Sequence, residues 1–138
     1  MSLIEGKNCL ITGATSGIGR STALALSEMG ANIFFIARNS QKAEELTEEI
    51  EGVSGKSPYS IIADLSSFKQ IEKAAEEYKS LNKPIDVLLN NAGIMNTERR
   101  VTEDGLEEVF AVNHLAYFLL TNLSVSYTHL TLPTNREV

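Results

Sequence analysis

The chain has 138 residues, enough for one domain with a buried core. Its composition is that of an ordinary globular protein, with 43% hydrophobic and 22% charged residues. The net charge of -6 argues against a protein that binds nucleic acid, because phosphate-binding surfaces are basic. No apolar run is long enough to span a membrane and no signal-peptide pattern opens the chain. We therefore expect a cytoplasmic protein, with its single cysteine, Cys9, reduced and buried.

Strand and helix patterns alternate along most of the chain. Short apolar runs predict four buried strands, at residues 8–12, 32–37, 59–63 and 85–89. Apolar residues at helical spacing predict helices between them. The first runs from Gly17 to Met29, and the second begins at Asn39 or Ser40 and ends before a loop at 52–57. The third is capped by Ser66 or Ser67. The fourth is capped by Thr102 and continues to Leu123. In the first helix we expect Ile18, Ala23, Leu26 and Met29 on one apolar face. Strands joined by helical crossovers predict an α/β fold, a doubly wound parallel sheet (Rossmann fold) in the order 3-2-1-4.

Three glycines join the first predicted strand to the first predicted helix, in Thr12-Gly-Ala-Thr-Ser-Gly-Ile-Gly19. Glycines allow a tight turn and the close approach of a phosphate, which the N–H groups of the helix start then face. A plain strand-to-helix turn is the alternative, but it needs only one glycine. The stretch therefore predicts a phosphate-bearing ligand held by Gly13, Thr15, Ser16, Gly17, Ile18 and Gly19.

A cation follows the second predicted strand, where dinucleotide-binding folds distinguish their two cofactors. An acidic residue about twenty positions after the glycines binds the ribose 2′-hydroxyl of NAD, whereas an arginine accommodates the 2′-phosphate of NADP. Here Arg38 follows Gly19 by nineteen residues, and no acidic residue ends the strand. Asn39 can add a donor. A solvated surface arginine is the alternative, but this position favours NADP over NAD.

Polar residues also follow the third and fourth predicted strands. Asp64-Leu65 is compatible with a helix-capping turn as well as with a ligand site. In Asn90-Asn91-Ala92-Gly93 the amides can tie neighbouring strand ends together, and the small residues allow backbone to approach a ribose. Asn113 lies in the last helical stretch, where asparagine is unfavourable unless its amide has a particular task. An Asn-Gly turn and an exposed helix asparagine are the respective alternatives.

These motifs, in this order, resemble the short-chain dehydrogenase/reductase family over nearly all of residues 1–124. The resemblance implies that Asp64 and Leu65 form the adenine pocket, and that Asn90, Asn91, Ala92 and Gly93 lie beside the cofactor. It also gives Asn113 a catalytic role, by kinking its helix and freeing a carbonyl that holds a water of the proton relay. The stretches 102–106 and 113–121 are most similar to the retinol-dehydrogenase-like branch. That similarity implies NADP, a small lipophilic alcohol or carbonyl substrate, and a homo-oligomeric parent.

The resemblance also implies a serine and a Tyr-x-x-x-Lys pair that the chain lacks. Tyr127 comes too soon after Asn113, and Thr131 stands where the lysine belongs. Residues 125–134 resemble a translated sequencing adaptor, with a natural β-rich tail as the alternative. We therefore expect an incomplete, inactive NAD(P)-binding domain over 1–124, truncated after about four strands, and a non-native or disordered tail over 125–138. The competing hypothesis is a non-catalytic dinucleotide-binding or sensor module, and no metal site is predicted.

Overall fold

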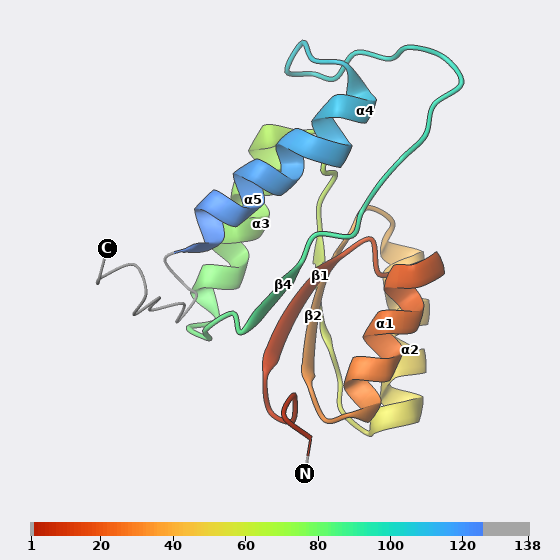
Figure 1. Ribbon diagram of the computed structural model, residues 1–138, viewed down its shortest axis with the longest axis vertical. Helices are drawn as coiled ribbons and strands as arrows, with labels where there is room; N and C mark the ends of the chain where they lie inside the picture. The colour runs from red at the N-terminus through yellow and green to blue at the C-terminus, as the bar shows by residue number, and fades with distance from the viewer. Residues whose placement is uncertain (1, 126–138) are drawn as a thin grey trace.

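Four parallel strands form a single sheet in a computed structural model that describes residues 2–125 (Figure 1). The strands are β1 (Asn8–Thr12), β2 (Asn32–Ala37), β3 (Tyr59–Ile62) and β4 (Val87–Leu89), in the order β3-β2-β1-β4. Strand β1 is central and pairs with β2 from Asn8 opposite Asn32 to Thr12 opposite Ile36. The predicted strand order is confirmed, although β4 begins two residues later and β3 ends one residue earlier than the sequence predicts.

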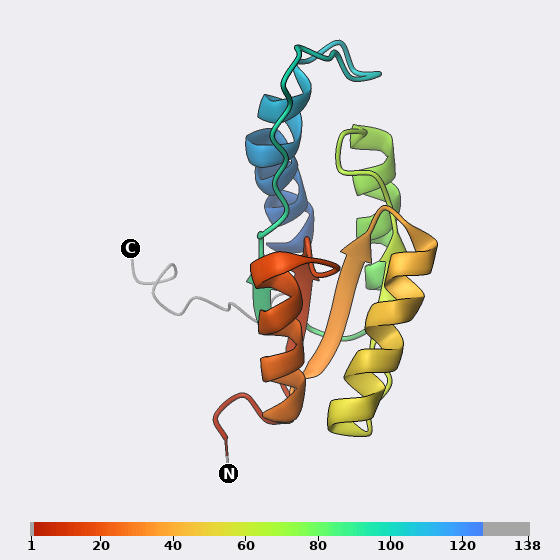
Figure 2. The ribbon, with the colours of Figure 1, turned by 90° about the vertical axis from the view of Figure 1, so that its right-hand side faces the viewer.

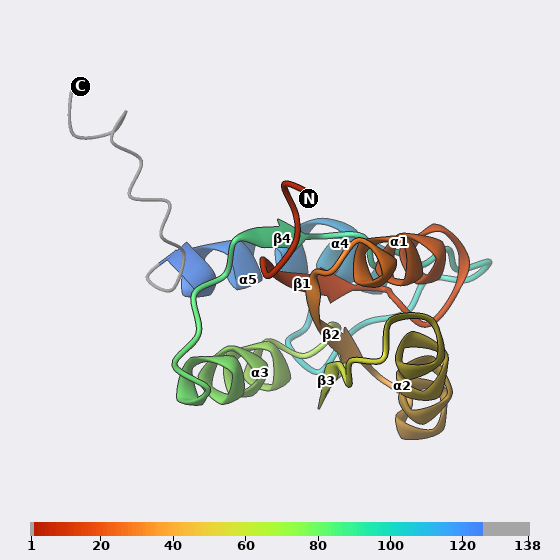
Figure 3. The same ribbon diagram turned by 90° about the horizontal axis from the view of Figure 1, so that it is seen from below.

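Helices cover both faces of this sheet, as the doubly wound fold requires. Helices α1 (Gly17–Glu28) and α2 (Ser40–Ser54) pack on one face, and α3 (Phe68–Ser80) and α5 (Ala116–Ser124) on the other (Figure 3). Alternate residues of each strand point to opposite faces, so Cys9 and Ile11 join the first core and Leu10 joins the second. Cys9 is buried as a free thiol, as predicted.

Side-chain caps explain where α2 and α3 begin, whereas α1 has no side-chain cap at Ser16. The Asn39 side chain accepts from the Lys42 N–H at 3.0 Å, and Ser67 caps α3 in the same way. Gly55, at φ +72°, ends α2 in the left-handed conformation. Helix α2 therefore extends through Gly52 to Ser54, so our prediction of a loop from residue 52 is wrong by three residues.

The predicted apolar face of α1 is only partly correct. Ala23 is buried and Leu26 packs against the first core, whereas Ile18 is 80% exposed and Met29 is 49% exposed. Ile18 lies in the first turn and lines a shallow groove on the surface of α1 rather than the core. Met29 lies past the last helical residue, so helical spacing no longer sets its direction.

The last helical stretch begins five residues later than the sequence predicts, because its N-cap is Glu107 and not Thr102. Thr102 does not cap a helix: its Oγ1 accepts from the N–H groups of Asp104 and Leu106 and closes a turn in which Gly105 has φ +77°. The helix cap is Glu107, whose carboxylate accepts from the N–H groups of the first turn. Helix α4 (Glu108–Phe110) continues into a π-helical turn, η1 (Ala111–Leu115), and then into α5.

Strand β4 lies at the edge of the sheet, and its residues Val87, Leu88 and Leu89 are only half-buried. After β4 the chain leaves the sheet, runs as a long loop along α4 and α5, and turns back at their start (Figure 2). Within residues 2–125, no helix is both long and apolar enough to cross a bilayer, and no cluster of metal-ligating side chains is present.

Candidate functional site

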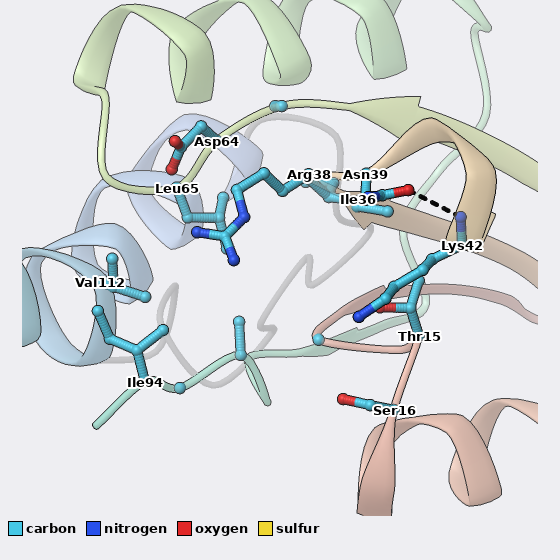
Figure 4. A pocket seen from close by; sticks show the side chains of 15 residues that line it. Thr15, Ser16, Ile36, Arg38, Asn39, Lys42, Asp64, Leu65, Ile94 and Val112 are labelled. Atoms are coloured by element: carbon cyan, nitrogen blue, oxygen red, sulfur yellow. Dashed lines mark hydrogen bonds between the residues drawn. The ribbon is translucent and has the colours of Figure 1, made fainter. Parts of the chain in front are cut away.

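One pocket opens where the carboxyl ends of the four strands meet (Figure 4). Residues at or after the ends of all four strands contribute to its lining. Ligands of open α/β sheets bind at this place, outside the carboxyl ends of the strands. Nine of the predicted site residues line it: Gly13, Thr15, Ser16, Arg38, Asn39, Asp64, Leu65, Ala92 and Gly93. The sequence did not identify six further lining residues, namely Ile36, Ala37, Lys42, Ala63, Ile94 and Val112.

The three glycines of the first loop have three different roles. Gly13 has φ +67°, and a Cβ there would lie 2.7 Å from the Cα of Ala92. Gly19 is buried, and its missing Cβ leaves room for the Gly13 carbonyl and the Asn91 amide. Gly17 has φ +55° and open space around it. Gly17 and Ile18 lie on a separate, shallow groove of α1 rather than in the main pocket.

A hydroxyl and an amide join the β1 loop to the β4 loop. Thr12 Oγ1 accepts from the N–H groups of Asn91 and Ala92, both at 3.0 Å, and Asn91 Nδ2 donates to the Gly13 carbonyl at 3.1 Å. Asn91 therefore ties strand ends together, as the sequence predicts. The role of Thr12 was not predicted, although a hydroxyl at the end of a buried strand is a recognisable signal. The two loops form one wall of the pocket.

Asn90 points away from the pocket. Its Nδ2 donates to Thr121 Oγ1 of α5 at 3.0 Å, while its buried Oδ1 has no partner among residues 2–125. Asn90 therefore fixes the end of β4 to the helical layer, and the structure does not bring it into the group of residues around the pocket.

Cationic side chains lie on the β2 side of the pocket. The exposed guanidinium of Arg38 extends toward Leu65, and the ammonium of Lys42 lies beside Thr15 (Figure 4). Within the described part of the chain, the Arg38 side chain has neither a hydrogen bond nor an ion pair. Asn39 Oδ1 accepts a hydrogen bond from the Lys42 N–H. The side-chain NH2 group and the backbone of Asn39 are therefore the groups that it can offer a ligand.

Asp64 contributes to a turn and to the pocket wall at once. Its Oδ1 accepts from the Ser66 N–H at 2.9 Å, and its own N–H donates to Gln70 Oε1 at 2.7 Å. The helix-capping alternative is therefore present, but it does not remove Asp64 and Leu65 from the lining. The turn therefore holds Asp64 in the pocket lining, at the end of β3.

Asn113 occupies the centre of the π-helical turn. Its Oδ1 accepts from the Ile94 N–H at 2.8 Å, and its Nδ2 donates to the Ile94 carbonyl at 2.9 Å. The distortion predicted for this helix is thus a widened turn, a feature often found at functional sites. Next to it, Tyr117 donates its hydroxyl to the Ala92 carbonyl, and burial raises the Tyr117 pKa. These contacts position the loop that follows β4.

Comparison with known proteins identifies the family. A family model described as short chain dehydrogenase matches residues 7–129. The chain belongs to the short chain dehydrogenase family. It is 41% identical to human retinol dehydrogenase 13 over 121 residues, which are 87% of this chain and 37% of that protein. It is also 43% identical to human dehydrogenase/reductase SDR family member 12, over 86% of this chain and 37% of that protein.

Solved structures agree with this assignment. A metagenomic short-chain oxidoreductase in complex with NADP superimposes with a TM-score of 0.79 at 29% identity, over 91% of this chain and 58% of that one. The chain spans less than half the length of the first two relatives. It is therefore an oxidoreductase by family, with the Rossmann fold and the retinol-dehydrogenase-like similarity that the sequence predicts.

The pocket of this short chain dehydrogenase fits the phosphates and ribose of a nicotinamide dinucleotide. Arg38 and Lys42 supply positive charge, Thr15 and Ser16 supply hydroxyls, and α1 begins at the glycine loop. Cations, hydroxyls and the N–H groups of a helix start are all donors, which is what phosphate oxygens require. No atom lies within 4 Å of the position that a Cβ would take at Gly17, so a phosphate has room to approach the backbone there.

The tyrosines of the described residues do not supply an acid–base group. Burial raises the pKa of Tyr78 to about 12, and the pKa values of Tyr59 and Tyr117 are raised as well. A proton donor for neutral pH needs the opposite shift. Tyr127, the adaptor-like residues 126–134 and the rest of the predicted tail after Val125 lie outside the described residues. The domain boundary at 124 remains a prediction.

Proposed function

We propose that this chain is the cofactor-binding part of an NADP-dependent oxidoreductase that interconverts an alcohol and a carbonyl compound. The observation that carries the cofactor choice is Arg38, whose guanidinium extends into the pocket after β2 where no acidic residue ends the strand. A guanidinium offers a planar, permanently charged fork to a phosphate, whereas a carboxylate at this point would repel it. The chain therefore favours NADP over NAD.

The remaining site residues have roles that follow from their positions. The glycine loop and the start of α1 face the pyrophosphate, with Thr15 and Ser16 as hydroxyl donors. Asp64 and Leu65 border the adenine, and Ala92 and Gly93 let the backbone approach the ribose. The bound cofactor supplies the hydride chemistry at its nicotinamide ring. Asn113 positions the Ile94 segment that closes this end of the pocket.

The substrate is the less determined part of the proposal. Similarity to retinol dehydrogenases 13 and 14 supports a small, lipophilic alcohol or carbonyl. We further propose that the complete protein is a cytoplasmic homo-oligomer. This 138-residue chain is expected to be inactive alone, because none of its tyrosines is followed by a lysine four residues later. The alternative hypothesis is a non-catalytic dinucleotide-binding or sensor module, which needs no such tyrosine and lysine.

Direct titration tests the cofactor assignment without requiring turnover. The 138-residue chain is titrated with NADPH and NADH while the fluorescence of the nicotinamide is followed. We expect saturable binding of both, with the tighter dissociation constant for NADPH. Equal affinities, or a preference for NADH, would contradict the proposal.

A further inference from the structure

The start of α3 receives its acidic partner from a distant part of the chain. The first turn of this helix contains no acidic residue, although the positive end of a helix dipole favours one. Instead, Asp104 Oδ2 accepts a hydrogen bond from the Phe68 N–H at 3.0 Å, across 36 residues of sequence. Ser67 Oγ accepts from the Gln70 N–H of the same turn. One cap of α3 is therefore local, and the other comes from the loop that precedes α4.

A tight turn presents Asp104 to α3. Thr102 Oγ1 accepts from the N–H groups of Asp104 and Leu106, and the Thr102 N–H donates to the Leu106 carbonyl at 2.7 Å. Gly105 takes the left-handed conformation inside this turn. In Figure 2 the turn extends from the start of α4 toward the start of α3. These bonds fix the place from which the Asp104 carboxylate reaches the neighbouring helix.

Both sides of this contact are joined to residues of the pocket. On the α3 side, the N–H groups of Ser66 and Ser67 bond to Asp64, which lines the pocket together with Leu65. On the other side, the turn leads directly into the helical stretch that carries Val112, another lining residue. Leu65 and Val112 lie at the same end of the pocket (Figure 4). The contact therefore links two walls that come from different parts of the chain.

We propose that Asp104 is a positioning residue of the cofactor pocket, because it fixes the wall before α3 relative to the wall that follows the start of α4. The inference rests on the proposed function, in which Asp64 and Leu65 border the adenine. With the bond from Phe68 in place, both walls are ordered before the cofactor arrives. Without it, binding has to order them, and this cost lowers the affinity.

The competing role for Asp104 is stabilisation of the fold alone, as a charge at a helix start provides. The two roles differ in their coupling to the cofactor. If the contact strengthens cofactor binding, the bound cofactor must strengthen the contact by the same factor. A contact that only stabilises the fold leaves the affinity of the folded chain unchanged and does not respond to the cofactor.

The test uses the 138-residue chain and its Asp104→Ala and Asp104→Asn variants. Nicotinamide fluorescence gives the dissociation constants of NADPH and NADH. We expect Asp104→Ala to weaken NADPH about fivefold, which is within the range of one hydrogen bond. NADH should weaken by the same factor, because the adenine is common to both cofactors. Asp104→Asn should retain most of the affinity, since its amide oxygen can still accept from the Phe68 N–H.

Hydrogen exchange at the Phe68 amide, measured by NMR, gives the second readout. Saturating NADPH should slow this exchange in the wild-type chain and leave it unchanged in Asp104→Ala. This arm needs only the wild-type chain to be folded, so it decides between the two roles even if Asp104→Ala does not fold.

Two control variants separate positioning from charge and from stability. Glu103→Ala makes the same change of net charge one residue away, where the exposed carboxylate has no hydrogen bond within residues 2–125. Asn32→Ala removes the bonds from Asn32 Nδ2 to the Gly6 carbonyl and to Asn8 Oδ1 at the opposite end of the sheet. It lowers stability away from the pocket, and urea denaturation measures by how much. Neither control should change cofactor affinity in the folded chain.

Each other outcome overturns a defined statement. Unchanged affinity in Asp104→Ala, an equal loss in Asn32→Ala, or a Phe68 amide that does not respond to NADPH in the wild type overturns the inference. A wild-type preference for NADPH over NADH leaves the proposed function standing in each of these cases. A folded wild-type chain that binds neither cofactor overturns the proposed function and this inference with it.

Discussion

Arg38 is the residue on which the predicted cofactor preference depends. Replacement by aspartate removes the charge-assisted pairs to the 2′-phosphate and places a repelling charge in the same exposed position. We expect Arg38→Asp to weaken NADPH binding by roughly 1.5–3 kcal/mol and to affect NADH much less. Parallel titrations with both cofactors measure the change in their affinity ratio.

Arg99→Asp is the control for this substitution, since Arg99 is exposed in the loop after β4 and does not line the pocket. It makes the same change of net charge, so a general charge effect would appear in both variants. An unchanged affinity ratio in Arg38→Asp would show that the 2′-phosphate is not recognised at this position.

Gly19 tests the close contact between the two loops of the site. A Cβ at Gly19 would overlap the Gly13 carbonyl and the Asn91 amide, so part of the backbone must move. We expect Gly19→Ala to destabilise the fold by roughly 1–3 kcal/mol, as overpacking does, and to weaken cofactor binding as well. Urea denaturation followed by circular dichroism measures the change in unfolding free energy.

Gly52 provides the opposite case in the same chain. It lies in α2 with no atom near its missing Cβ and without a positive φ. Gly52→Ala should therefore stabilise the protein, by about 0.5–1 kcal/mol. If both alanine variants shifted stability in the same direction, the contact assigned to Gly19 would be wrong.

Individual residues also show what a sequence can and cannot predict about this site. Gly13 and Arg38 are visible because they follow apolar strands at a fixed spacing. Lys42 was not identified because it looks like any solvated lysine of a charged helix. Only the packing of α2 against α1 brings its side chain over the glycine loop.

Among the elements, the π-helical turn η1 links the helical layer to the β4 loop. Its Asn113 makes two hydrogen bonds to the backbone of Ile94, both exposed to solvent. We expect Asn113→Ala to cost about 1 kcal/mol of stability and to increase hydrogen exchange at the Ile94 amide. Exchange measured by mass spectrometry or NMR detects this local opening.

Asn122→Ala separates that effect from a general loss of helix stability. Among residues 2–125, the side chain of Asn122 bonds only to the Phe118 carbonyl within its own helix, and Asn122 is similarly exposed. Its replacement should leave exchange at Ile94 unchanged. Equal protection at Ile94 in wild type and Asn113→Ala would mean that Asn113 does not hold the loop.

Helix boundaries were predicted well where a side chain caps them and poorly where a turn imitates a cap. Asn39 and Ser67 are true caps at the predicted positions. Thr102 has the same chemistry but closes a turn through Gly105, and the bridge between Val101 and Glu107 delays the helix to Glu108. Local sequence does not distinguish a polar side chain that caps a helix from one that closes a turn.

At the scale of the whole molecule, the exposed edge of β4 predicts self-association. Within residues 2–125, β4 pairs with β1 alone, and its three apolar residues are half-buried. Unpaired apolar strand edges promote aggregation. We expect the folded 138-residue chain to self-associate through this edge as its concentration rises, which light scattering detects. A chain that stays monomeric at every concentration would contradict this.

Catalysis is the second prediction for the whole chain. Among residues 2–125, Tyr59, Tyr78 and Tyr117 all have raised pKa values, so each stays protonated as an ineffective acid–base group near neutral pH. We expect no oxidation of NADPH above background with a panel of aldehydes and ketones. Turnover that is abolished by Tyr127→Phe would refute this and would restore a functional role to the predicted tail.

The order of the strands followed from the sequence, but the assembly of the site did not. Strand alternation and right-handed crossovers are enough to predict β3-β2-β1-β4. The contacts of Thr12 with the loop after β4 depend on two segments separated by almost eighty residues. No local pattern specifies such a contact.

The bonds from Thr12 to Asn91 and Ala92 also have a consequence for the order of events during protein synthesis. A ribosome releases the glycine loop first, and the amides that hold it 79 and 80 residues later. The strands β1, β2 and β3 can pair before then, since domains begin to form during translation. The nascent chain would therefore pass through an interval with a sheet but an unanchored phosphate loop, and would acquire affinity for its cofactor only after Ala92 has left the exit tunnel.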